Sequence, residues 1–338
     1  MARRPRIEDV DVLSDAIAAM RTGVPHSSRT RCSAPWGMRF PASEGAGFHI
    51  VLQGSCWLLP PSGGEPLALS AGDVVFLAQG GVYGLADAPD TPLVPVVRRG
   101  EEWVWEAPPE AGGGPTTLLL CGAYRLSRAR PHPLLAELPA VVHLPARIGA
   151  HRALRAAVDL LGGELEAPGP GSDAAIPALL DTLLLYILRA WLADHSERAT
   201  TGWAAALADP AIAEALDAIH RDPAHPWTVA GLGRLAGLSR AAFARRFTTV
   251  VGQPPLAYLT WWRMTVAGRL LDSTEAPLRV VAQRSGYSSE FAFAKAFRRE
   301  LGMSPGQYRN GERAAARSAR SARAGEPAAA LAVPDLAP

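Results

Sequence analysis

The strongest constraint on the fold is an internal repeat with an offset of 50 residues in the last third of the chain. In each copy a short helical segment, 229–236 or 278–284, precedes a glycine and a serine that can cap a second helix. The repeat therefore predicts a helix-turn-helix unit that occurs twice. Seven pairs of like residues superimpose: Ser239 on Ser289, Phe243 on Phe293, Arg245 on Lys295, Phe247 on Phe297, Gly252 on Gly302, Pro255 on Pro305 and Tyr258 on Tyr308.

The second helix of each unit has one apolar face and one polar face. Phe243 and Phe247 recur at helical spacing, as do Phe293 and Phe297, so we expect these faces to be buried. The joining segment 256–271 predicts a helix of about sixteen residues, or ~24 Å. Two helix-turn-helix units held ~34 Å apart can enter successive major grooves on one face of a DNA duplex.

Charge is distributed unevenly along the chain. Residues 1–208 carry 17 basic and 21 acidic side chains, whereas residues 209–310 carry 13 basic and 8 acidic ones, a net charge of +5. A basic segment that coincides with the repeat favours double-stranded DNA as a partner. The longest aliphatic run, 183–188, is far shorter than the ~20 residues that span a bilayer, and the N-terminus has no signal-peptide pattern. We therefore expect a cytoplasmic protein without a membrane span.

Four motifs follow one another in the repeat region: Pro255-Tyr258, Arg263-Ala267-Leu270-Leu271, Gly286-Tyr287 and Gly302-Ser304-Pro305-Tyr308-Arg309. Through these motifs residues 209–310 resemble the DNA-binding domain of the AraC/XylS family of bacterial transcription regulators. The resemblance implies that both second helices insert into major grooves. It also implies RNA polymerase as a protein partner.

Positions on the two second helices give the candidate DNA-binding residues. The resemblance implies base contacts from Arg240, Ala241, Ala244 and Arg245 in the first groove, and from Ser289, Glu290, Ala292 and Lys295 in the second. Arg245 and Lys295 are the strongest candidates, because their cationic groups can bind O6 and N7 of guanine. A solvated helix face is the alternative for any single arginine. Phosphate contacts are expected from Arg246, Arg298 and Arg299.

Residues 30–135 have the pattern of short strands separated by turns. Glycine and proline interrupt apolar runs of three to five residues, which predicts strands rather than helices. We expect a small β-barrel, closed by the apolar run 117–121. The other runs lie at 48–52, 56–59, 67–69 and 74–77.

From residue 134 onward the apolar periodicity becomes helical. Ile176, Leu180, Leu183 and Ile187 recur at intervals of three and four, and this helix can form an antiparallel hairpin with the segment 150–161. The apolar face either packs on the barrel or joins two chains. We expect a homodimer formed through this hairpin.

Several stretches of the first domain resemble the cupin-like domain that accompanies this DNA-binding domain in one branch of the family: Arg39-Phe40-Pro41, 48–54, Ala71-Gly72-Asp73-Val74-Val75 and Cys121-Gly122. Enzymatic cupins hold a metal with clustered histidines and a glutamate. Here only His49 stands near the first position, Gln53 follows it, and Tyr83 replaces a histidine usual in this branch. We therefore expect no metal site, no cofactor and no catalysis. The alternative is a metal-dependent cupin enzyme fused to a DNA-binding module.

The cysteines allow two interpretations. Cys32 and Cys121 match the positions of two cysteines in family members that resemble regulators of the response to reactive chlorine. In the first interpretation Arg29 and Arg31, which flank Cys32, lower the pKa of its thiol, and oxidation leads through a sulfenic acid to a disulfide. The alternative is that both cysteines are small apolar residues in the interior, as we expect for Cys56.

Together these patterns predict a multidomain α+β protein that regulates transcription. Its N-terminal domain would be a cupin-like β-barrel that senses an unknown effector, and its C-terminal domain would be an all-α double helix-turn-helix. The expected segments are an N-terminal helical arm at 1–29, the sensor at 30–135, a helical dimerisation and linker region at 136–208, the DNA-binding domain at 209–310 and a disordered tail at 311–338.

Overall fold

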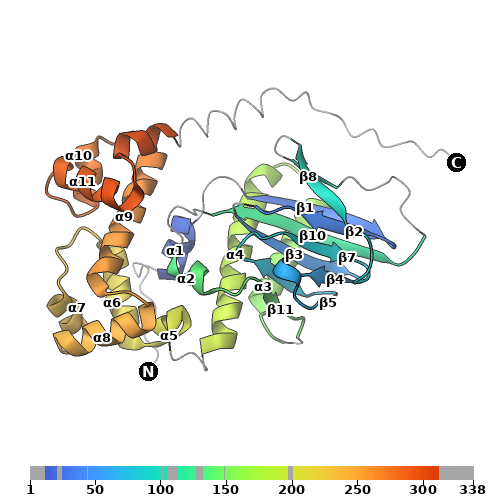
Figure 1. Ribbon diagram of the computed structural model, residues 1–338, viewed down its shortest axis with the longest axis horizontal. Coiled ribbons are helices and arrows are strands. Elements are labelled where there is room, and N and C mark those ends of the chain that lie inside the picture. Colours follow the sequence, from blue (N-terminus) through green and yellow to red (C-terminus); the bar gives the residue numbers. More distant parts are fainter. Residues whose placement is uncertain are drawn as a thin grey trace.

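The computed structural model describes residues 12–20, 25–43, 45–99, 102–105, 113–126, 132–147, 149–196 and 201–311. A helical part lies at one end and a strand-rich part at the other, with further helices between them (Figure 1). The predicted tail lies outside the described residues apart from residue 311, and so do residues 1–11 of the predicted N-terminal arm.

The strand-rich part consists of two sheets. The first has the order β1 (His26–Ser33), β10 (Thr116–Arg125), β3 (Gly45–Gln53), β6 (Val74–Leu77) and β11 (Val142–Leu144). The second has the order β5 (Leu67–Ser70), β4 (Ser55–Leu59), β7 (Tyr83–Ala86), β2 (Gly37–Phe40), β8 (Val94–Arg99) and β9 (Glu102–Trp105). The strands are short because glycine turns separate them, as at Gly54, whose φ of +79° favours glycine.

The two sheets are not closed into one barrel, which corrects the prediction from the sequence. The run 117–121 lies in β10, which pairs antiparallel with β1 on one side and with β3 on the other. A strand with partners on both sides has no free edge with which to close a barrel. The sheet also extends past the predicted boundary at residue 135, because β11 pairs with β6.

The first sheet is buried on both of its faces. Because side chains alternate along a strand, Val51 and Leu119 enter the core between the two sheets, whereas Ile50 and Leu120 enter the core on the other side. Helices α3 (Arg152–Glu166) and α4 (Ser172–Ser196) pack on each other and cover that second face (Figure 1). The Tyr124 hydroxyl of β10 donates to the Leu180 carbonyl of α4 at 2.7 Å.

The two helices form the antiparallel hairpin that the sequence predicts. Ser172–His195 is long and apolar enough to cross a membrane by length and composition. Its buried residues, including Leu183, Leu184 and Ile187, instead belong to the core that contains the sheet. The apolarity of this helix is therefore accounted for by packing inside the protein.

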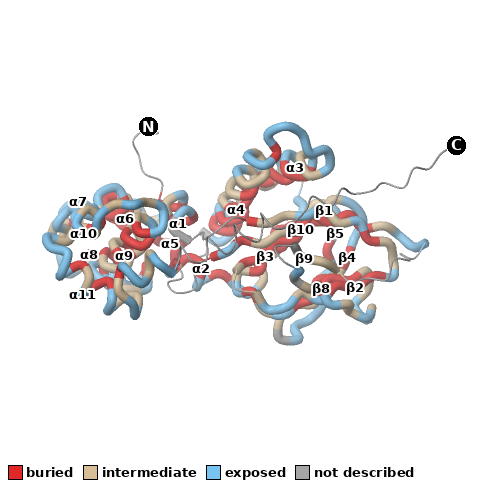
Figure 2. The backbone as a smooth tube through the Cα atoms, turned by 90° about the horizontal axis from the view of Figure 1, so that it is seen from above, coloured by how far each residue is buried: buried red, intermediate tan, exposed pale blue. Residues whose placement is uncertain are grey.

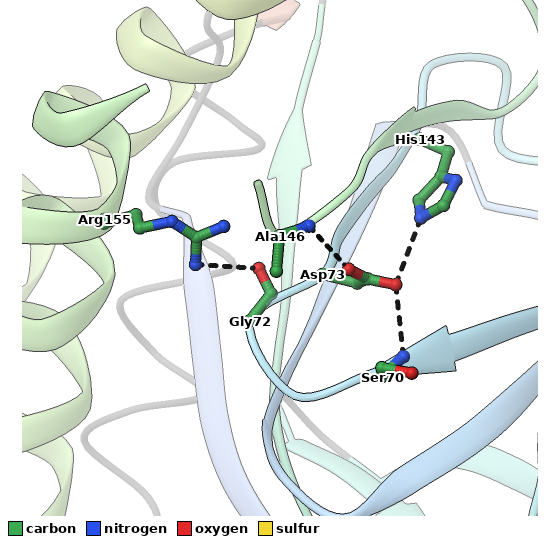
Figure 3. A network of polar contacts seen from close by, with 6 residues as sticks. All are labelled: Ser70, Gly72, Asp73, His143, Ala146 and Arg155. Carbon is green, nitrogen blue, oxygen red and sulfur yellow. Dashed lines mark hydrogen bonds and ion pairs between the residues drawn. The ribbon is translucent and has the colours of Figure 1, made fainter. Parts of the chain in front are cut away.

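A polar network ties the turn between β5 and β6 to its surroundings (Figure 3). The carboxylate of Asp73 accepts a hydrogen bond from the backbone N–H of Ala146 at 2.7 Å, and it lies 3.3 Å from Nε2 of His143. Arg155 of α3 donates to the carbonyl of Gly72 at 3.3 Å. The turn motif seen in the sequence thus fixes α3 and the loop after β11 to the sheet.

The helical end confirms the two predicted helix-turn-helix units. The first consists of α7 and α8 and the second of α10 and α11; α9, 19 residues long, joins them. A further helix covers 305–311. The helices are α5 (Gly202–Ala208), α6 (Pro210–Arg221), α7 (Val229–Leu235), α8 (Arg240–Val251), α9 (Pro255–Ser273), α10 (Leu278–Arg284) and α11 (Glu290–Leu301).

One apolar core runs from the first sheet into the helical end. It includes Phe48 of the sheet, Leu183 of α4, Trp203 of α5 and Trp262 of α9. Figure 2 shows buried segments both in the strands and in the helices of the helical end. Helix α5 contacts both α4 and α8, and α1 (Val12–Met20) contacts α4, α6 and α9. The strand-rich part and the helix-turn-helix units therefore pack against one another through this core.

Polar side chains fix this junction. The ring of His220 stacks on Trp262 with centroids 3.8 Å apart, its Nε2 lies 2.6 Å from the Tyr258 hydroxyl, and its Nδ1 lies 3.3 Å from the Asp15 carboxylate of α1. Burial lowers the pKa of His220, while Asp15 acts in the opposite direction. Helix α1 is thereby attached to the helical end of the structure although it is distant in sequence.

Candidate functional site

The two second helices, α8 and α11, are built by the same local chemistry. The Ser239 hydroxyl accepts the backbone N–H of Ala242 at 3.3 Å, and the Ser289 hydroxyl accepts that of Ala292 at 3.2 Å. Each helix ends at a glycine with a left-handed conformation, with φ of 79° in the first copy and 74° in the second. Equivalent caps at both ends explain why two helices of 12 residues occur at the same places in the repeat.

Each of these helices buries its aromatic face against the helix that follows it. The ring of Phe247 lies 5.9 Å from that of Tyr258, and the ring of Phe297 lies 5.5 Å from that of Tyr308. Phe243 and Phe293 are also fully buried. The opposite faces of α8 and α11 are therefore directed outward.

The outward faces carry almost all of the predicted DNA-binding residues. Ala244 alone among them is only partly exposed. Arg245 and Lys295 occupy equivalent places and form no ion pair with other described residues, so their charges are available to a ligand. The exposed residues are Arg240, Ala241, Arg245, Arg246, Ser289, Glu290, Ala292, Lys295, Arg298 and Arg299.

Two of the predicted phosphate-binding arginines already have acidic partners. Nε of Arg246 lies 2.5 Å from the carboxylate of Asp209, which caps α6. Arg299 lies 2.9 Å from its neighbour Glu300. Both arginines are exposed, and the pair of Arg299 lies at the surface, where an ion pair contributes ~0–1 kcal/mol. The carboxylate of Asp209 is largely buried, so Arg246 is held more firmly than Arg299.

Two other arginines, which belong to the family motifs, have a structural role. Arg263 on α9 donates to the carbonyls of Pro223 at 2.7 Å and His225 at 2.9 Å. Arg309 donates to the carbonyl of Ala276 at 2.6 Å. These bonds fix the loops around α9, so the two arginines stabilise the packing of the helical end rather than extend outward from α8 or α11.

The sequence reasoning missed one prominent residue of this surface. Phe291 on α11 is 81% exposed, whereas Phe293 two positions later is fully buried. The sequence does contain a signal for this exposure. Residue 291 is not at helical spacing from the buried residues 293 and 297, so it lies on a different face of the helix.

A second candidate site is a cavity of about 420 Å³ between the two sheets. Phe40 stacks on Tyr83 with ring centroids 4.8 Å apart, and Nε2 of His49 lies 2.7 Å from the Tyr83 hydroxyl. The remaining wall includes Met38, Val96, Trp105 and Cys121 among other residues. None of the described lining residues is Asp, Glu, Lys or Arg.

Burial keeps the polar groups of this cavity uncharged. It lowers the pKa of His49 to about 3 and raises the pKa of Tyr83. The Nδ1 atom of His49 and the hydroxyl of Ser27, which also lines the cavity, have no hydrogen-bond partner among the described residues. The cavity thus combines aromatic walls with neutral polar groups.

The structure does not assemble metal ligands from the predicted positions. Gln53 is exposed at the end of β3, while His49 and Tyr83 face each other in the cavity. In the part of the chain that the structure describes, no three His, Cys, Asp or Glu side chains lie where they could hold a metal ion. His49, His132 and His143 instead lie at hydrogen-bonding distance from Tyr83, the backbone N–H of Leu134 and Asp73, respectively.

The three cysteines are free and buried. Desolvation raises the pKa of Cys32 to about 12, which is opposite to the lowering that the redox interpretation requires. Arg29 instead forms an ion pair with Glu166 at 2.8 Å. Burial also raises the pKa of Cys121.

Strand register also separates the two cysteines that were predicted to form a disulfide. Cys32 stands opposite Thr117, and Cys121 stands opposite Ser28. Four residues along a strand span ~14 Å, about twice the largest Cα separation that a disulfide bridges. In this register the two cysteines are therefore too far apart to form a disulfide.

Comparisons with known proteins agree with both parts of the chain. Residues 11–193 match the family model described as Cupin, and residues 232–311 match the one described as Helix-turn-helix domain. A putative AraC-like transcription regulator of Streptomyces antibioticus is 35% identical over 89% of this chain and 98% of that protein. The RCS-specific HTH-type transcriptional activator RclR of Escherichia coli (strain K12) is 30% identical over 78% of this chain and 83% of that protein.

Among solved structures, the DNA-binding domain of AdpA in complex with a target DNA is 36% identical, over 32% of this chain and 96% of that chain, with a TM-score of 0.30. The fold, the outward helices and the matched relatives define a DNA-binding transcription regulator with a cupin sensing domain. The chain belongs to the family of AraC-like transcription regulators.

Proposed function

We propose that the chain binds an operator with both helix-turn-helix units, placing α8 in one major groove and α11 in the next. The observation that supports this most is the repeated geometry: the same cap, the same buried aromatic face and an exposed cation at the same place, Arg245 or Lys295. Helix α9, at about 1.5 Å for each of its 19 residues, is ~28 Å long. With the flanking turns it approaches the ~34 Å between successive grooves.

Within this arrangement Arg245 and Lys295 contact base edges, together with the other residues predicted from the repeat. Arg245 can bind O6 and N7 of guanine with two hydrogen bonds, and such a pair discriminates against a wrong base by ~1–3 kcal/mol. Arg298, Arg299 and Arg246 bind phosphates, which sets the register without reading sequence. Arg246 contributes least of the three, because it must leave Asp209.

The effector binds in the cavity between the two sheets. A volume of about 420 Å³ suits a small organic molecule, and the uncharged wall with its Phe40–Tyr83 stack favours a flat, neutral and largely apolar one. The cavity walls in β3 and β10 also pack on α4, which contacts α5, which contacts α8. A ligand that prefers one arrangement of these elements would change the DNA-binding state.

We further propose that the protein is a cytoplasmic homodimer that interacts with RNA polymerase. We also propose that it has no enzymatic activity. The α3–α4 hairpin is the proposed dimer contact, because Leu160 of α3 is 61% exposed. The matched relatives are transcription regulators, which supports a non-catalytic part for the cupin domain. The cysteines are assigned to the interior packing that surrounds the cavity.

Fluorescence anisotropy of the full-length protein on DNA from upstream of its own gene tests the DNA-binding proposal. Arg245→Ala and Lys295→Ala are each expected to weaken specific binding by tenfold or more and to relax base preference at one position. Arg39→Ala, an exposed arginine on β2, is the charge-matched control. If both recognition-helix variants bind with unchanged affinity and preference, the placement of α8 and α11 is wrong.

A further inference from the structure

Phe291 stands out among the apolar side chains at the surface. Its exposed fraction of 81% is the largest of any large apolar residue that the structure describes. Burying a phenylalanine side chain is worth ~1.5–3 kcal/mol, so the fold gains nothing from leaving this ring in water. The ring is not needed for capping either, because Ser289 caps α11 through the backbone N–H of Ala292. Among the exposed large apolar residues that the structure describes, Phe291 alone lies on α8 or α11, so a partner of α11 would account for its exposure.

The surroundings of Phe291 indicate what that partner is. Residues at spacings of four and seven share one face of a helix, so Lys295 and Arg298 follow Phe291 along the outward face of α11. The cations lie toward the end of the helix, whereas the acidic Glu290 and the apolar Phe291 lie in its first turn. A carboxylate and an aromatic ring have no attraction for phosphates, so this first turn is suited to base edges and the last turn to the DNA backbone.

Only one base presents an apolar group in the major groove, namely thymine through its C5-methyl. Resting on the proposed insertion of α11, we propose that Phe291 is a specificity-determining residue that packs on the C5-methyl of a thymine in the second groove. The equivalent residue of the first copy is Ala241, which is also exposed and apolar but much smaller. The two half-sites are therefore read unequally, with the stronger methyl contact in the half-site bound by α11.

Single substitutions of thymine by deoxyuridine test this contact, because they remove the methyl group and leave every hydrogen-bonding atom in place. For the full-length protein we expect one thymine in the α11 half-site at which the substitution weakens binding about fourfold, the factor that corresponds to ~0.8 kcal/mol for one methyl-sized group. In Phe291→Ala this sensitivity should disappear at that thymine and persist elsewhere. Val82→Ala, another exposed apolar residue, is the matched control and should behave as the wild type.

Two outcomes would overturn the inference. One is an equal response of the wild type and Phe291→Ala to deoxyuridine at every thymine. The other is a Phe291→Ala variant that binds all these DNAs normally but no longer regulates transcription, which would assign the ring to a protein partner. Failure of the proposed function gives a different result, because neither protein would then prefer operator DNA over unrelated DNA of the same length.

Discussion

The buried imidazole of His49 makes the stability of the protein depend on pH in a calculable way. Burial lowers the pKa of His49 to about 3, whereas histidine in an unfolded chain has a pKa of ~6.5. Between these two values the unfolded chain binds one proton more than the folded protein. Stability therefore falls as the pH is lowered through this range, and the loss ends near the folded pKa.

The size of the loss follows from the two pKa values. At pH 5.5, one unit below the unfolded pKa, protonation favours the unfolded chain by ~1.4 kcal/mol, and at pH 7.5 the effect is close to zero. His49→Gln removes the titrating group and retains a side chain that can hydrogen-bond to Tyr83. The difference in stability between wild type and variant should change by ~1.4 kcal/mol between the two pH values, and the other histidines cancel in this comparison.

Urea unfolding followed by tryptophan fluorescence measures this difference. The free energy of unfolding is expected to fall by ~3 kcal/mol per molar urea. Between pH 7.5 and pH 5.5 the midpoint urea concentration of the wild type should therefore decrease by ~0.5 M more than that of His49→Gln. Parallel loss in the two proteins would refute the argument, since His49 would then be protonated as readily in the folded protein as in the unfolded chain. The cavity wall would in that case carry a charge, and the proposed neutral effector would have to be abandoned.

Three further predictions concern the DNA-binding end and the cysteines. Arg263→Lys should destabilise the protein by ~1–3 kcal/mol, because an ammonium group cannot reproduce the forked hydrogen bonds to two carbonyls. Urea unfolding measures this loss, and a variant as stable as the wild type would contradict the prediction. Ser239→Ala and Ser289→Ala should each lower the free energy of unfolding by ~1 kcal/mol, and the two losses should add in the double variant. Thermal unfolding measures these losses, and strong non-additivity would mean that the two caps are coupled. Peptide mapping after treatment of the native protein with diamide should find no Cys32–Cys121 disulfide, and its appearance would show that β1 and β10 can shift register.

The helical end could be predicted from the sequence to within a few residues because its signals are local. A capping serine, a terminal glycine and apolar residues at helical spacing act within a single helix, and the repeat supplies them twice. The outward positions of Arg245 and Lys295 could be predicted in the same way, because the buried phenylalanines define the inner face of each helix. Phe291 was not predicted as a site residue, although its position on the helix differs from that of the buried Phe293 and Phe297.

For the strand-rich part the sequence predicted only the class of fold, namely short β-strands separated by turns. Periodicity identified short strands, but it holds no information on which strands pair, and β10 proved to lie inside a sheet rather than at its closing edge. The separation of Cys32 from Cys121 depends on that register, so no spacing in the sequence reveals it.

The sequence by itself determined that this chain carries two equivalent helix-turn-helix units, because caps and apolar faces are encoded within each helix. Only the tertiary structure decided the chemistry of the sensor and its attachment to those helices. The pKa values of His49 and Cys32 depend on desolvation by strands that meet from distant parts of the chain. The junction at His220 likewise joins residues about two hundred positions apart, through contacts that exist only once the core has formed.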